Sequence, residues 1–103
     1  MKLLIQSALI AATVAFGAPA MANTALAQKS GCLACHAVDK KVVGPAYQEV
    51  AKKYAGNMKA EDLAKRIKLG GSGHWGPVPM PPQAALSEAD AKTLATWILG
   101  GAK

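Results

Sequence analysis

Three stretches of this 103-residue chain carry apolar residues at the spacing of an amphipathic helix. Residues at positions i, i+3, i+4 and i+7 lie on one helical face, which can pack against a core. The three faces are Tyr47, Val50, Ala51 and Tyr54; Ala60, Leu63, Ala64 and Ile67; and Ala91, Leu94, Ala95 and Ile98. A shorter helix is expected from Asn23 or Thr24 to near Gly31. Because no stretch indicates a strand, the pattern predicts an all-α domain of about four short helices.

Residues at the helix ends support these boundaries. Pro45 suits the first turn of the helix that stops near Gly56. Ser87 is the expected N-cap of the last helix, and Asp90 follows three residues later. The helix over 60–69 is expected to carry two ion pairs on its solvent side, Glu61 with Lys65 and Asp62 with Arg66.

The sequence Cys32-Leu33-Ala34-Cys35-His36 is the attachment signature of c-type haem. Each thiol can add to one haem vinyl group, and the adjacent imidazole can then reach the iron. A redox dithiol is the main alternative, but that motif expects a βαβ context. A zinc site needs four ligands, and His36 and His74 are the only histidines beside a single cysteine pair. A plain disulfide would leave His36 without a role. The motif therefore predicts one covalently bound haem c with its iron.

The second axial ligand of the iron is expected to be Met80. It lies in a loop, residues 74–82, whose four prolines exclude both helix and central strand. A thioether ligand also raises the reduction potential relative to a second imidazole. His74 is the competing ligand, although the glycines before it constrain its backbone less. In the remaining interpretation, Met80 only covers an open haem face.

The N-terminal residues 1–22 are typical of a secretory signal peptide. Lys2 precedes an apolar run from Leu3 to Phe16, and Ala20-Met21-Ala22 fits a cleavage site. Ala25-Leu26-Ala27 also fits, but cleavage there would remove most of the first helix. We expect residues 23–103 to form the mature domain, in the periplasm and without a membrane anchor. A domain this small has a marginal core, which a covalent haem would help to fill.

The mature chain resembles the small bacterial class I cytochromes c. The resemblance is carried by Gly-Cys-Leu-Ala-Cys-His at 31–36, Val-Gly-Pro-Ala-Tyr at 43–47, Trp-Gly-Pro-Val-Pro-Met-Pro-Pro at 75–82 and Leu-Ala-Thr-Trp-Ile-Leu at 94–99. It implies the cytochrome c fold, in which the helices surround the haem.

The same resemblance implies roles for four further residues of the haem pocket. The Pro45 carbonyl would accept a hydrogen bond from His36, Arg66 and Trp75 would bind a haem propionate, and Gln83 would lie near the Met80 sulfur. From the sequence alone, Arg66 is equally a partner of Asp62, and Trp75 an ordinary core aromatic. His74 stands where relatives often have an apolar residue, and its role is open.

The expected function is electron transfer, with no enzymatic activity. Removing Lys2 leaves 11 basic residues against the 6 acidic ones of the chain, which suits either an acidic redox partner or simple solubility. The resemblance implies partners among nitrite reductases, terminal oxidases and upstream cytochrome complexes. An exported protein meets no nucleic acid in its ordinary work, and a monomer is expected. The alternative is a haem-based sensor or peroxidase-like enzyme with an open iron site.

Overall fold

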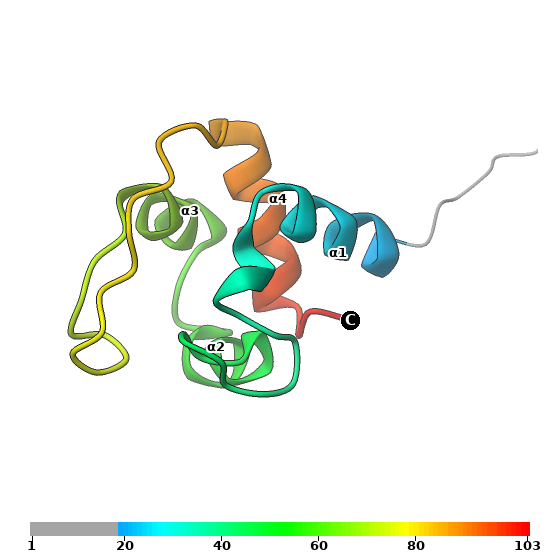
Figure 1. Cartoon of the computed structure of the whole chain (residues 1–103). Helices are drawn as coiled ribbons and strands as arrows, with labels where there is room; N and C mark the ends of the chain where they lie inside the picture. The colour runs from blue at the N-terminus through cyan, green and yellow to red at the C-terminus, as the bar shows by residue number, and fades with distance from the viewer. Residues whose placement is uncertain (1–18) are drawn as a thin grey trace, which may run out of the picture.

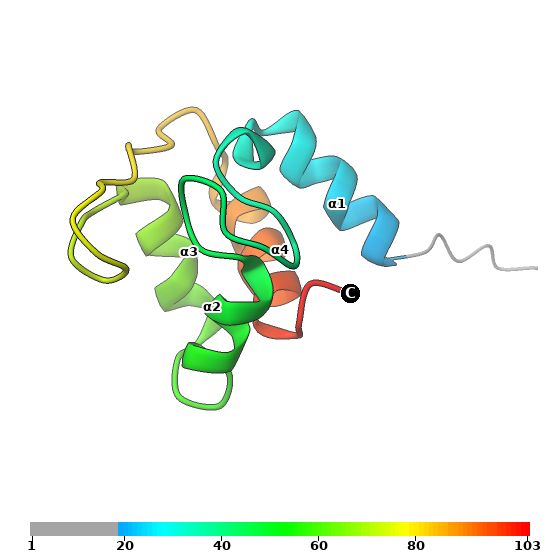
Figure 2. The ribbon, with the colours of Figure 1, turned by 60° about the horizontal axis from the view of Figure 1, so that its bottom comes forward.

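Helix α4, Glu88–Leu99, is the element on which the other helices pack. The structure is a computed structural model, and it describes residues 19–103. Within this range the other helices are α1 (Pro19–Lys29), α2 (Tyr47–Tyr54) and α3 (Ala60–Leu69), with a short 3-10 helix η1 at Cys32–Ala34. Figures 1 and 2 show α1 and α3 on either side of α4, with α2 near its C-terminal end. The all-α prediction is confirmed.

The core forms where the predicted apolar faces meet. The side chains of Tyr47, Val50, Leu63, Ile67 and Leu94 are buried in one cluster, and Leu94 is only 1% exposed. Trp97 joins this cluster from α4, and its indole Nε1 donates a hydrogen bond to the Lys103 carbonyl at 3.2 Å. Burial of these faces against α4 is the main source of helix stability in so small a domain.

Helix α1 extends back to Pro19, the first described residue, beyond the expected start at Asn23 or Thr24. Residues 1–18 of the predicted signal peptide lie outside the described residues, and cleavage after Ala22 stays a prediction. Over residues 19–103, no helix has both the length and the apolar character needed to cross a membrane.

Helix α2 begins at Tyr47, so Pro45 lies just before the helix and not in its first turn as predicted. The preceding loop explains the later start. The backbone N–H groups of Tyr47 and Gln48 donate to the carbonyls of Ala37 and Val38, at 2.9 and 3.0 Å. The first N–H groups of the helix therefore have partners without a further turn.

The two ion pairs expected along α3 are not formed. Glu61 lies 3.8 Å from Lys92 of α4, and Arg66 donates instead to the Tyr54 hydroxyl at 3.0 Å. A neighbouring helix and an aromatic side chain thus offer these groups nearer partners than their own helix does. Exposed pairs such as Glu61–Lys92 add little stability, typically about 0–1 kcal/mol.

Ser87 is the N-cap of α4, as predicted. Its hydroxyl oxygen accepts a hydrogen bond from the Asp90 backbone N–H at 3.0 Å. We expect Ser87→Ala to lower the free energy of unfolding by about 1 kcal/mol, because one N–H of the first turn loses its partner. Thr93→Ala, on the exposed side of the same helix, is the matched control and should change stability by less than about 0.5 kcal/mol. Denaturant titration measures both, and equal losses would contradict the capping role.

Candidate functional site

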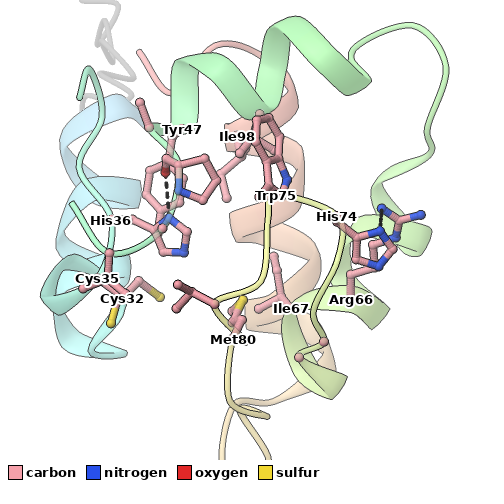
Figure 3. Close-up of a pocket in the computed structure, with 18 of the residues that line it drawn as sticks. Cys32, Cys35, His36, Tyr47, Arg66, Ile67, His74, Trp75, Met80 and Ile98 are labelled. Atoms are coloured by element: carbon pink, nitrogen blue, oxygen red, sulfur yellow. Dashed lines mark hydrogen bonds between the residues drawn. The ribbon is translucent and has the colours of Figure 1, made fainter. Parts of the chain in front are cut away.

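A cavity of about 500 Å³ opens between the helices and the loops 31–47 and 70–83. Its volume lies within the range of cofactor sites, about 300–1,000 Å³. The inner lining is apolar and comes from α2, α3 and α4, with Val50, Leu63, Ile67, Leu94 and Ile98 among the lining residues. Figure 3 shows Cys32, Cys35, His36 and Met80 gathered around this space. The cavity suits a large apolar group with a few polar attachment points.

The two cysteines lie on one wall of the cavity. The turn η1 places them there, and its backbone closes with hydrogen bonds from the N–H groups of Cys35 and His36 to the Cys32 carbonyl, at 3.1 and 3.0 Å. Gly31 is the N-cap residue of this turn. Both thiols are free and partly buried. A single turn therefore presents two unpaired sulfur atoms to the same apolar space.

The environment of Cys32 is unlike that of a redox dithiol. Burial raises the pKa of the Cys32 thiol, and a hydrogen bond with Tyr47 offsets this only in part. Burial likewise raises the pKa of the Tyr47 hydroxyl. Reactive thiols of the dithiol enzymes have a lowered pKa and a more polar setting. The burial of Cys32 and its raised thiol pKa thus disfavour the dithiol alternative.

His36 is held firmly in one orientation. The expected contact with Pro45 is present, since His36 Nδ1 lies 2.8 Å from the Pro45 carbonyl oxygen. The ring also stacks on Tyr47, with centroids 5.0 Å apart and planes inclined by 20°. With Nδ1 donating to Pro45, Nε2 is the ring nitrogen left to bind a metal.

Gly44 packs directly against the His36 ring. A Cβ atom added at Gly44 would lie 2.5 Å from His36 Cε1 and 2.9 Å from Nδ1. Such distances are far shorter than a carbon contact allows, so only glycine fits here. Gly44 and Tyr47 had no assigned role toward His36 in the sequence analysis. The turn signal of Gly44-Pro45 could have indicated a close backbone approach.

Met80 and His74 occupy different parts of the same loop. Met80 is partly buried and lines the cavity, whereas His74 lies beside Arg66 at the edge, with its Nδ1 3.4 Å from Arg66 Nη1 (Figure 3). The neck of the loop is closed by two backbone hydrogen bonds between Gly71 and Met80, of 3.0 and 2.8 Å. The loop thereby turns the Met80 side chain into the cavity.

The remaining predicted pocket residues also line the cavity but have other partners in the structure. Arg66 donates to Tyr54, and Gln83 Nε2 donates to the Pro81 carbonyl at 3.0 Å. Trp75 is 40% exposed and meets the Tyr54 ring edge-on at 6.1 Å. It is therefore not the core aromatic that the sequence alone allowed. All three residues lie on the outer part of the cavity lining.

Comparison with known proteins agrees with this geometry. The cytochrome c family profile matches residues 20–102. The chain belongs to the cytochrome c family. Cytochrome c-551 of Allochromatium vinosum is 55% identical over 82 residues, which cover 79% of this chain and 87% of the relative. Cytochrome c-551 of Pseudomonas aeruginosa is 54% identical over 87 residues, covering 84% and 83%.

A solved structure shows the same fold. The crystal structure of Nitrosomonas europaea cytochrome c552 superposes with a TM-score of 0.73 at 54% identity, and the match covers 75% of this chain and 96% of that structure. The chain is thus a small bacterial class I cytochrome c, with the function of electron transport. Its cofactor is one covalently attached haem c with iron.

The described residues fit such a cofactor. Two free thiols face an apolar cavity of suitable size, and the nearby imidazole has its Nδ1 occupied and its Nε2 available. A thioether lies on the lining as well. Over residues 19–103 no group of three or more His, Cys, Asp and Glu side chains is placed to hold a metal ion by itself.

Proposed function

We propose that this cytochrome is a periplasmic carrier of single electrons, with His36 and Met80 as the axial ligands of the haem iron. The bound group supplies the chemistry, a change of iron between ferric and ferrous states. The observation that carries the proposal is the convergence of Cys32, Cys35, His36 and Met80 on one apolar cavity. Cys32 and Cys35 would form the thioether bonds.

The protein side chains then tune and shield the iron. The Pro45 carbonyl would fix the His36 ring and increase its donor strength, as outer-sphere acceptors do for histidine ligands. The Met80 thioether favours the ferrous state. Buried residues such as Leu94 and Ile98 exclude water from the cavity. With His36 and Met80 both holding the iron, no position would be left for a substrate, so we propose a carrier and not an enzyme.

The outer part of the cavity supports docking of a redox partner. Val43 and Val78 line the cavity and are 50% and 59% exposed, so they offer an apolar contact at its mouth. Lys40 and Lys41 line the same opening. We propose that an acidic partner binds here transiently, such as a nitrite reductase, a terminal oxidase or an upstream cytochrome complex. Arg66, Trp75 and Gln83 would contact the propionate and methionine side of the haem.

The first test is an optical spectrum of protein produced by export with the haem-attachment machinery present. The expected result is a c-type ferrous spectrum, a far-red methionine–iron band in the ferric protein and no response to carbon monoxide. Rapid carbon monoxide binding by the ferrous protein would instead favour the sensor or peroxidase-like alternative. A colourless protein with titratable thiols would favour the dithiol interpretation instead.

A further inference from the structure

The loop that carries Met80 has few packing contacts of its own. Every residue from 71 to 79 is exposed. Its internal hydrogen bonds, between Gly71 and Met80 and from the Gly73 N–H to the Gly76 carbonyl at 3.0 Å, shape the loop but do not attach it to the helices. Segments with little buried apolar surface open at low free energy. The edge-on contact of Trp75 with Tyr54 of α2 is the aromatic packing at the tip of this loop, and polar contacts help to hold the tip in place.

Two cations from different helices meet at the tip of the loop. Lys53 of α2 donates from Nζ to the His74 backbone carbonyl at 2.8 Å, and the same Nζ lies 4.5 Å from the centroid of the Trp75 ring. Arg66 of α3 contacts the His74 ring. Lys53 thus contacts two successive loop residues, the backbone carbonyl of His74 and the aromatic face of Trp75.

The neighbouring lysine shows that this arrangement is not a general property of the helix surface. Lys52 lies on the same turn of α2 and is also exposed, but it pairs with Glu49 at 3.1 Å within the helix. Lys53 reaches across to a segment 21 residues away in the chain. Its Nζ also lies 5.3 Å from the centroid of the Tyr54 ring.

We propose that Lys53 is a positioning residue, which keeps the loop closed and so keeps the Met80 sulfur at its place in the cavity. The inference rests on the proposed ligation by Met80. Each opening of the loop tip would let the neck at Gly71 and Met80 separate and the thioether leave the iron. A charge-assisted hydrogen bond and a cation–π contact, both partly exposed, together raise the ratio of closed to open loop about fivefold.

The experiment compares three variants as complete haem proteins. Lys53→Met keeps the apolar stem but removes the donor and the charge. Lys52→Met removes the same charge from the adjacent position and is the matched control. Lys53→Arg can still donate to the His74 carbonyl and lie over the Trp75 ring. Imidazole is added to the ferric protein, and the loss of the far-red band reports the rate at which it displaces methionine.

We expect imidazole to displace methionine about fivefold faster in Lys53→Met than in the unmodified protein. Lys52→Met should stay within about twofold of the unmodified rate, and Lys53→Arg should restore most of the lost protection. Equal rates in the Lys53→Met and Lys52→Met proteins would overturn the proposal, because charge alone would then explain any change. An unchanged rate in Lys53→Met would overturn it as well.

A fourth variant separates the Lys53 contact with the His74 backbone from the Arg66 contact with the His74 ring. His74→Val removes the imidazole beside Arg66 but keeps the carbonyl that accepts from Lys53, so its rate should rise less than that of Lys53→Met. A larger rise in His74→Val would assign the loop closure to the Arg66–His74 contact and overturn the role of Lys53. If Met80 is not the ligand, the unmodified protein itself would lack the far-red band and bind carbon monoxide, so that outcome is recognised separately.

Discussion

Replacing Met80 by alanine is expected to open the iron to carbon monoxide and to lower the reduction potential by on the order of 100 mV. The Met80 side chain lines the cavity from an exposed loop, and among the described residues 19–103 no other methionine lines it. Under the proposed ligation by Met80, an alanine methyl group cannot take its place on the iron, and the ferrous form loses the ligand that favours it. Potentiometric titration and a carbon monoxide spectrum measure the two effects.

Met58→Ala is the control for that experiment. Met58 is partly buried and packs against the same core, but it is not among the residues that line the cavity. It should lower the free energy of unfolding while leaving the potential and the far-red band unchanged. A Met80→Ala protein that kept its native potential and far-red band would contradict ligation by Met80.

Replacing Gly44 by alanine is expected to displace the His36 ring and to cost about 1–3 kcal/mol of stability. The new Cβ would lie 2.5 Å from His36 Cε1, so the ring must tilt or the backbone must move. Either change disturbs the 2.8 Å contact with the Pro45 carbonyl. A weaker contact with Pro45 should reduce the donor strength of the imidazole and so raise the reduction potential, which potentiometric titration measures. Denaturant unfolding measures the loss of stability.

Gly100→Ala provides the comparison for this substitution. A Cβ at Gly100 would meet its nearest atom, the Thr96 carbonyl oxygen, at 3.4 Å, and the backbone φ of −82° is acceptable for alanine. Alanine there should be neutral or slightly stabilising, because it restricts the unfolded chain. If Gly44→Ala behaves like Gly100→Ala, then His36 has more freedom than its three contacts indicate.

The helices were predictable because each encodes its own buried face. The apolar spacing in α2, α3 and α4 placed the core residues correctly, and Ser87 marked the start of α4. The start of α1 was not predictable in the same way. That helix is short of long apolar side chains, so no strong periodic face defines its ends, and it extends back to Pro19, the first described residue.

The attachment motif was predictable because its chemistry is local, whereas contacts made through space were not. Cys32, Cys35 and His36 lie within one turn, so their spacing alone indicates a haem. By contrast, the approach of Gly44 to His36 depends on how a loop folds back. Lys53 reaches His74 only after two helices have packed. Arg66 selects Tyr54 over Asp62 for the same reason.

The cavity is formed by two segments far apart in the chain, the turn around Cys32 and the loop around Met80. A group bound to both would act as a reversible cross-link, whose strength depends on oxidation state. Because a thioether binds ferrous iron more strongly, reduction should tighten the cross-link. In the thermodynamic cycle of reduction and unfolding, the reduced protein then resists denaturant better than the oxidised one. For this one-electron couple, the difference in unfolding free energy equals the Faraday constant times the amount by which folding raises the reduction potential.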